Sequence, residues 1–167
     1  MNIVIIGCGR VGAFLAGLLD EDGHAVTVVD LERTSFEHLP KSFNGNTLLG
    51  SGTDLDILRQ AGIESADACF ALTQGDNRNL MAAQIAREIF GVRRIVAKVN
   101  DPVRARLYRT QGLTTVSRTT ILGTLLHAML MQDAEVGKVL IERSLAHEER
   151  LAQDPQAGTL PAGAKER

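Results

Sequence analysis

The chain alternates between short apolar runs and longer segments in which apolar residues recur every three or four positions. The short runs are typical of strands, and the longer segments have the period of helices. Strands are predicted at residues 2–6, 25–30, 46–49, 68–72, 94–98 and 114–117. Strands that are apolar on both faces and separated by helices belong to a parallel sheet covered on both sides. The pattern therefore predicts an α/β fold with a doubly wound, six-stranded parallel sheet.

Glycine marks the ends of the predicted helices. Four helical segments end at a glycine, and each is followed within a few residues by the next strand: Gly23, Gly62, Gly91 and Gly112. Glycine adopts the left-handed backbone conformation without a side-chain clash, so it commonly closes the last turn of a helix. These positions support the division into six strand–helix units.

The composition is that of an ordinary globular domain. The chain has 167 residues, of which 44% are hydrophobic and 23% charged, and its formal net charge is −2. This excludes a wholly disordered chain and predicts no basic surface for nucleic acid. No apolar stretch is long enough to cross a bilayer and no signal sequence is visible, so a cytoplasmic location is expected. Cys8 and Cys69 are expected to be buried, reduced thiols, not parts of a disulfide framework or a zinc site.

The first predicted turn carries the main chemical signal. Residues 7–12 read Gly-Cys-Gly-Arg-Val-Gly and lie between the first strand and the first helix. In this Rossmann-like pattern Gly7 permits a tight turn, Gly9 lets the backbone approach a phosphate, and Gly12 lets helix and strand pack closely. Asp30 ends the second strand, 18 residues after Gly12, where a ribose diol would be bound. The pattern predicts a nucleotide site, with a purely structural glycine turn and a solvated Asp30 as the alternative.

Other polar residues stand at the predicted carboxyl ends of strands, where doubly wound folds bind ligands. Arg10 lies inside the glycine turn, where it would contact a phosphate or simply face solvent. Asp54 suits either an adenine contact or the cap of the following helix. Lys98 ends the fifth strand and is either a ligand residue or a solvated lysine.

Several ordered motifs resemble one family. They are the glycine turn at 7–12, the Val-Val-Asp strand end at 28–30, the Gly-Ser-Gly-Thr-Asp segment at 50–54, residues 58–67, residues 72–79 and the Ala-Lys-Val-Asn-Asp segment at 97–101. Over about residues 1–132 the chain is similar to the amino-terminal RCK domain, also called KTN or TrkA-N, of Trk and Ktr potassium-uptake systems and some potassium channels. The resemblance implies a cytoplasmic, non-catalytic regulator that binds NAD(H), ATP, ADP or AMP. It also implies assembly as a homodimer or larger ring that gates an integral-membrane potassium transporter or channel.

The resemblance also assigns site residues. Gly9, Arg10, Val11 and Gly12 are expected at the phosphates, Asp30 at the ribose, Thr53 and Asp54 near the adenine, and Leu72, Thr73, Asp76, Asn79 and Lys98 along the crevice. Gly7, Leu31, Ser51 and Gly52 are also expected to belong to the nucleotide site. No catalytic or metal-binding residue is expected. Some ATP-binding relatives place an acidic metal ligand after the sixth strand, where this chain has Ser-Arg-Thr-Thr at 117–120. That departure argues against a magnesium-assembled triphosphate site.

The segment at 119–132 repeats apolar residues at helical spacing. An apolar helix of this kind is expected to dock on a second subunit, as the crossing helix of the resembling family does; the alternative is packing on its own sheet. His127 within it is expected to be a packed or edge histidine. Residues 133–152 predict a weakly amphipathic helix, and residues 153–167 a disordered tail. Residues 133–167 are too few for the family's carboxy-terminal lobe, so either another chain supplies that lobe or the domain is an isolated sensor.

Three classes of function follow from these residues. The first is a regulatory nucleotide-binding subunit of potassium transport, and the second is an NAD-dependent oxidoreductase. A dehydrogenase needs a proton-handling group near the nicotinamide, and the chain offers no convincing set of such residues, with Tyr108 as its only tyrosine. The sequence therefore favours binding without catalysis. A free-standing nucleotide or redox sensor with another partner is the third class.

Overall fold

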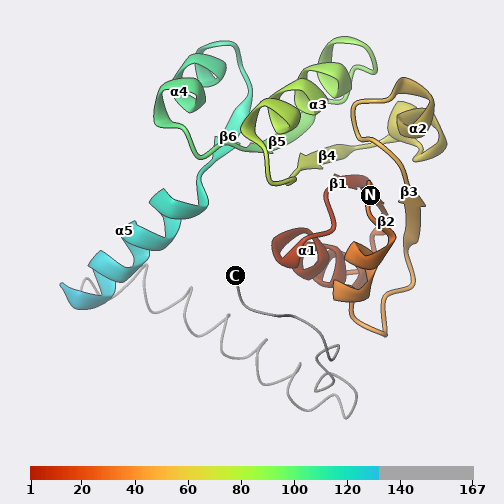
Figure 1. Cartoon of the computed structure of the whole chain (residues 1–167), viewed down its shortest axis with the longest axis horizontal. Helices are drawn as coiled ribbons and strands as arrows, with labels where there is room; N and C mark the ends of the chain where they lie inside the picture. The colour runs from red at the N-terminus through yellow and green to blue at the C-terminus, as the bar shows by residue number, and fades with distance from the viewer. Residues whose placement is uncertain (132–167) are drawn as a thin grey trace. The chain divides into compact units, whose positions relative to one another are not determined.

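The computed structural model describes residues 1–131 and contains a six-stranded parallel sheet (Figure 1). The strands are β1 (Asn2–Ile6), β2 (Ala25–Asp30), β3 (Asn46–Leu49), β4 (Ala68–Ala71), β5 (Arg94–Lys98) and β6 (Thr114–Val116). Their order across the sheet is β3-β2-β1-β4-β5-β6, and every neighbouring pair is parallel. The doubly wound α/β fold predicted from the sequence is confirmed.

Helices connect the strands across both faces of the sheet. The α-helices are α1 (Arg10–Glu21), α2 (Leu55–Gln60), α3 (Asp76–Glu88), α4 (Pro102–Thr110) and α5 (Arg118–Leu130), and the short 3-10 helices are η1 (Arg33–His38) and η2 (Ile63–Ser65). Residues 1–121 form one compact unit that contains the whole sheet. In Figure 1, α2, α3 and α4 cover one face of the sheet and α1 covers the other.

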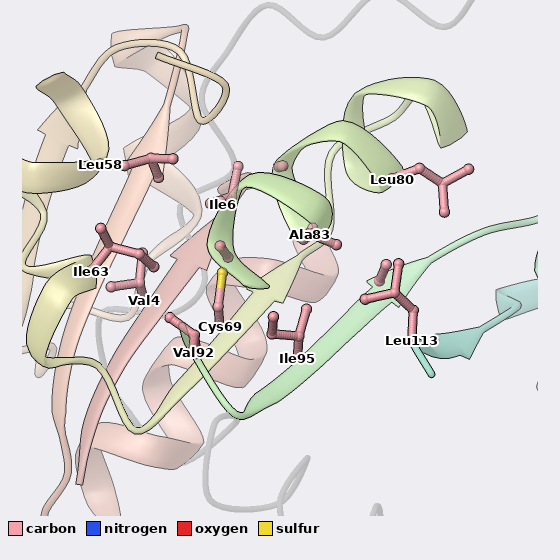
Figure 2. Packing of buried hydrophobic residues seen from close by; sticks show 14 of the residues in the cluster. Val4, Ile6, Leu58, Ile63, Cys69, Leu80, Ala83, Val92, Ile95 and Leu113 are labelled. Atoms are coloured by element: carbon pink, nitrogen blue, oxygen red, sulfur yellow. The ribbon is translucent and has the colours of Figure 1, made fainter. Parts of the chain in front are cut away.

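The two faces of β1 contribute to two separate cores. Val4 and Ile6 belong to the cluster on the α2–α4 face, whereas Ile3 and Ile5 pack on the α1 face. Figure 2 shows the first cluster, in which Leu80 and other apolar residues of the helices and loops lie against the strands. This alternation is the direct result of the two-residue period of a strand. It explains why β1 is apolar at consecutive positions.

The predicted helix ends are observed at all four glycines. Gly23, Gly62, Gly91 and Gly112 each have a φ between 68° and 85°, the left-handed conformation that glycine favours. Two strand ends differ from the prediction: β4 ends at Ala71 and β6 at Val116, each one residue early. Ser117 lies outside the strand and immediately before α5, where its Oγ accepts a hydrogen bond from the Thr120 amide at 3.3 Å. The sequence pattern did not identify η1 or η2.

Both cysteines have the surroundings predicted for them. Cys8 and Cys69 are both buried and free, as predicted. Burial raises the pKa of each thiol to about 12, and the negative charge of Asp30 contributes at Cys8.

The helix predicted over 119–132 is observed as α5, none of whose residues is buried. Within residues 1–131, no helix has both the length and the apolar character needed to cross a bilayer. The predicted helix at 133–152 and tail at 153–167 lie outside the described residues.

Candidate functional site

A cleft of about 610 Å³ opens at the carboxyl ends of the strands. The strand order reverses direction between β1 and β4, which is the point where open α/β sheets bind ligands. Segments that end or follow all six strands line the cleft. The lining residues are Ile6, Gly7, Gly9, Arg10, Val11, Val29, Asp30, Leu31, Glu32, Ser35, Gly52, Leu72, Thr73, Gln74, Gly75, Arg78, Lys98 and Arg118.

The glycine turn after β1 is tightly constrained at two positions. Gly7 has a φ of 105°, and a Cβ added there would lie 2.8 Å from the backbone nitrogen of Thr73. A Cβ at Gly12 would lie 1.9 Å from the carbonyl oxygen of Gly7. Both distances are too short for any side chain, so the turn between β1 and α1 requires glycine at these two positions.

Gly9 has a different environment. It lines the cleft, and a Cβ added there would meet no atom within 4 Å. Gly9 is also the residue that caps α1, and no side chain caps this helix end. The first amides of a helix lack partners within the helix, and the helix dipole favours a negative charge beside them. The missing side chain at Gly9 therefore gives an anion room to approach these amides.

Asp30 joins the end of β2 to the glycine turn. Its Oδ2 accepts a hydrogen bond from the Cys8 amide at 2.6 Å, and its Oδ1 accepts one from the Glu32 amide at 2.9 Å. Each carboxylate oxygen can accept a further hydrogen bond, so these contacts leave Asp30 able to bind a diol. Glu32 and Ser35 line the same end of the cleft. Acidic and hydroxyl acceptors therefore gather beside β2.

Basic side chains line the rest of the cleft. Arg10 follows β1, Arg78 lies in the first turn of α3, Lys98 ends β5 and Arg118 begins α5. Burial lowers the pKa of Lys98 below its ordinary value, the charge of Arg118 lowers it further, and the charge of Asp76 acts in the opposite direction. With four cations against the carboxylates of Asp30 and Glu32, the cleft favours anionic ligands.

Asn79 lies behind the cleft, not in its lining. It is fully buried, and its side chain makes four hydrogen bonds. Its Oδ1 accepts from the amide and the hydroxyl of Thr73, at 2.8 and 2.7 Å, and its Nδ2 donates to the carbonyl oxygens of Thr73 and Lys98, at 3.0 and 2.8 Å. Asn79 therefore fixes the backbone of two residues that line the cleft.

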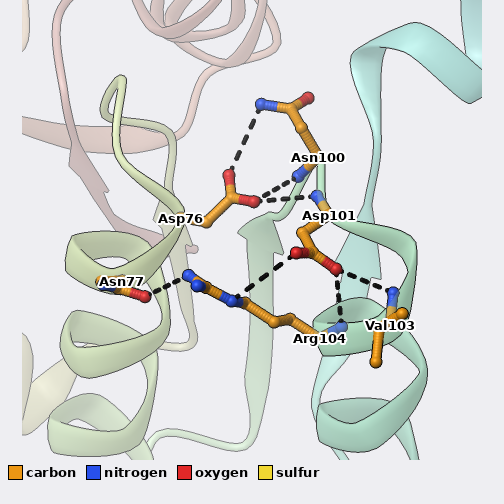
Figure 3. Close-up of polar contacts among 6 residues, drawn as sticks. All are labelled: Asp76, Asn77, Asn100, Asp101, Val103 and Arg104. Carbon is orange, nitrogen blue, oxygen red and sulfur yellow. Dashed lines mark hydrogen bonds and ion pairs between the residues drawn. The ribbon is translucent and has the colours of Figure 1, made fainter.

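Asp76 also makes structural contacts and does not line the cleft (Figure 3). Its Oδ2 accepts hydrogen bonds from the amides of Asn100 and Asp101, at 3.0 and 2.8 Å. Asp101 in turn caps α4, and Arg104 of that helix donates to the side chain of Asn77. Burial acts to raise the pKa of Asp76, but these backbone hydrogen bonds and the charges of Arg104 and Lys98 lower it below its ordinary value. The carboxylate thus joins the start of α3 to the start of α4.

The segment after β3 is organised around a helix cap. Asp54 accepts hydrogen bonds from the amides of Asp56 and Ile57, at 2.8 and 3.3 Å. This is the capping alternative named for Asp54 above. The hydroxyls of Ser51 and Thr53 are 2.9 Å apart and hydrogen-bond each other. Gly52 alone of this segment lines the cleft.

The structure brings most of the predicted site residues together. Ten of them line the cleft: Gly7, Gly9, Arg10, Val11, Asp30, Leu31, Gly52, Leu72, Thr73 and Lys98. Six do not: Gly12, Ser51, Thr53, Asp54, Asp76 and Asn79. The sequence did not identify Glu32, Ser35 and Arg118 as site residues, and it indicated Gln74, Gly75 and Arg78 only as members of the motif at 72–79. These residues follow the carboxyl ends of β2, β4 and β6, and that position in the sequence could have identified them. Among residues 1–131, no group of three or more His, Cys, Asp and Glu side chains is arranged to hold a metal ion.

Comparison with known proteins decides the family. Residues 3–119 match the family model of the TrkA-N domain. The chain belongs to the TrkA-N domain family. The resemblance to amino-terminal RCK domains is thereby confirmed. The Trk system potassium uptake protein TrkA of Streptomyces coelicolor is 50% identical to this TrkA-N domain over 117 residues, which are 70% of this chain and 52% of the relative. The chain spans about half the length of this and other TrkA relatives.

Solved structures of RCK proteins have the same fold. GsuK bound to ADP superimposes with a TM-score of 0.65 and 27% identity, covering 80% of this chain and 34% of that one. The GsuK channel bound to NAD superimposes with a TM-score of 0.62 and 27% identity, covering 73% of this chain and 22% of that one. Neighbours of this TrkA-N domain are thus known with adenine nucleotides bound.

Proposed function

We propose that this TrkA-N domain is a nucleotide-binding regulatory module of a potassium uptake system or channel. The main support is the cleft, because a helix start without a side-chain cap, the carboxylate of Asp30 and four basic residues line the same space and suit a phosphate and a ribose diol. The 50% identity to a protein named for potassium uptake supports the transport role. The neighbours bound to ADP and NAD support an adenine nucleotide as ligand.

The residues fit such a ligand in a definite order. Asp30 and Glu32 would accept hydrogen bonds from the ribose hydroxyls, and the amides after Gly9 would bind the phosphate nearest the ribose. Arg10 would add a charged contact to that phosphate. A nucleotide with a phosphate on the ribose 2′ oxygen would meet two carboxylates, so NADPH should bind more weakly than NADH.

Regulation requires the nucleotide to favour one shape of the assembly over another. A ligand shifts such an equilibrium only by the difference between its affinities for the two states. We infer that the domain works as a homodimer or larger ring on the cytoplasmic side of a membrane transporter or channel. In this scheme nucleotide binding changes the angles between subunits and so gates the membrane partner.

Calorimetric titration with AMP, ADP, ATP, NAD⁺, NADH and NADPH tests the proposed function. At least one of the nucleotides without a 2′-phosphate should bind, and NADPH should bind at least about tenfold more weakly than NADH. Failure of all of them to bind would contradict the proposal. Hydride transfer to or from simple alcohols or hydroxy acids would favour the oxidoreductase alternative. Binding without any effect on potassium flux would favour a sensor with another partner.

The exposed apolar face of α5 supports the dimer. Leu122, Leu126 and Met129 lie on one side of this helix and are 52%, 55% and 48% exposed. Fully burying an exposed side chain of this kind is worth about 1.5–3 kcal/mol, so covering the half of each that is still exposed would stabilise an interface by about 1 kcal/mol per residue. Leu126→Glu should therefore weaken the dimer by at least about tenfold, as measured by sedimentation. Thr124→Glu, on the opposite side of the helix, is the matched control and should leave the mass unchanged. A wild-type monomer, or equal behaviour of the two variants, would contradict the assignment.

A further inference from the structure

Charge is distributed unevenly along the cleft. The two carboxylates that line it, from Asp30 and Glu32, belong to the segment that ends and follows β2. The side chains of Arg78, Lys98 and Arg118 line it from the segments of β4, β5 and β6. In the sheet, β1 separates β2 from these three strands. The cleft therefore has an acidic end over β2 and a basic end over β4–β6.

Lys98 and Arg118 are neighbours at the basic end. Lys98 is paired with Val116 in the parallel register of β5 and β6, and Arg118 follows Val116 by two residues. The two positive charges are close enough to interact. Asp76 is the acidic group that also interacts with Lys98, but its carboxylate accepts hydrogen bonds from two backbone amides of the β5–α4 connection. Within residues 1–131, no hydrogen bond or ion pair engages the guanidinium of Arg118.

We propose that Lys98 and Arg118 form a subsite for the terminal phosphate of an adenosine di- or triphosphate, bound without a divalent cation. The proposal rests on the proposed function, because it assumes that the adenosine end lies over β2 and the first phosphate at the glycine turn. A ligand held in this way extends its remaining phosphates toward the basic end. Arginine and lysine both bind phosphate through charge-assisted hydrogen bonds, and the anion relieves the repulsion between the two cations.

The basic end also disfavours two other occupants. The nicotinamide ring of NAD⁺ carries a positive charge, which Arg78, Lys98 and Arg118 would repel. A magnesium ion at this end would meet the same repulsion, and the carboxylates of the cleft lie at the other end. Magnesium in solution also neutralises part of the charge of ADP and ATP. The free nucleotides should therefore bind more tightly than their magnesium complexes.

The test is a set of calorimetric titrations with AMP, ADP, ATP and NAD⁺, each in EDTA and in excess magnesium chloride. In EDTA, ADP and ATP should bind at least about tenfold more tightly than AMP and NAD⁺, and magnesium should weaken their binding. Arg118→Ala should weaken ADP by about tenfold and AMP by less than about threefold. Arg106→Ala removes the same charge from an exposed position on α4 outside the cleft and should change neither.

The outcomes separate this inference from the proposed function. Tighter binding in magnesium, equal affinities for AMP and ADP, or an equal loss of both in Arg118→Ala would overturn the terminal-phosphate subsite and leave the nucleotide-binding role intact. Failure of every nucleotide to bind would overturn both. Because Arg118 is exposed, Arg118→Ala should unfold at the wild-type temperature, and its binding can be compared directly with that of the wild type.

Discussion

Replacing Gly12 with alanine should reduce the free energy of unfolding by about 2 kcal/mol and abolish nucleotide binding. The added Cβ would lie 1.9 Å from the carbonyl oxygen of Gly7, a backbone atom that moves only if the turn after β1 moves. Alanine in place of a helical glycine normally gains up to about 1 kcal/mol, so the steric cost has to exceed this gain. Denaturant unfolding measures the loss of stability, and calorimetry measures binding.

Gly9→Ala is the matched variant, because it changes the same turn without a clash. A Cβ at Gly9 meets no atom within 4 Å, and the backbone there has an ordinary φ of −72°. Stability should therefore fall by no more than about 1 kcal/mol, the cost of alanine at a helix cap. Affinity for ADP should still fall by at least about tenfold, because the methyl group enters the space assigned to the phosphate. Equal stability of the two variants would contradict the packing role of Gly12, and unchanged affinity in Gly9→Ala would contradict the phosphate position.

The second large effect is expected at Asn79. Asn79→Ala removes four hydrogen bonds made by a fully buried side chain, and the Thr73 amide and the Lys98 carbonyl, both part-buried, lose that partner. An unsatisfied buried polar group costs about 1–3 kcal/mol, so the free energy of unfolding should fall by about 3 kcal/mol. ADP affinity should fall as well, since Thr73 and Lys98 both line the cleft. Denaturant unfolding and calorimetry again provide the measurements.

Asn77→Ala is the control for this change, because it alters the same residue type on the same helix. Asn77 is exposed, and its side chain contacts the guanidinium of Arg104. Exposed contacts of this kind contribute little, so stability should change by less than about 0.5 kcal/mol. If Asn79→Ala were no more destabilising than Asn77→Ala, the buried network would not support the loops of the cleft.

The fold could be predicted because its signals are local. Six apolar runs separated by helical segments specify a parallel sheet, and the glycines at 23, 62, 91 and 112 mark where helices end. The glycine turn could be predicted for the same reason, since a strand, three glycines and a helix are contiguous in the sequence. Asp30 completed the site because strand ends of a parallel sheet meet at one edge. Each of these inferences needed only neighbouring residues and a known sheet geometry.

The remaining site residues depend on contacts that the sequence does not encode locally. Asp54 and Asp76 are both acidic residues near strand ends, yet their carboxylates bind backbone amides outside the cleft lining. Asn79 is buried behind the cleft lining, whereas Arg78, one residue earlier on α3, lines the cleft. The direction of a helical side chain depends on where the helix begins, and one residue changes that direction by about 100°. Arg118 could not be assigned for the same reason, since the start of α5 sets its direction.

The most direct test of nucleotide binding in this cleft is the change in backbone amide NMR shifts during titration with ADP. The account predicts the largest changes at the amides of Gly9, Arg10 and Val11, with further changes at Gly52 and Thr73, and little change at the opposite ends of the strands. Saturating ADP that shifts none of these amides, or that shifts mainly residues far from the carboxyl ends of the strands, would contradict it.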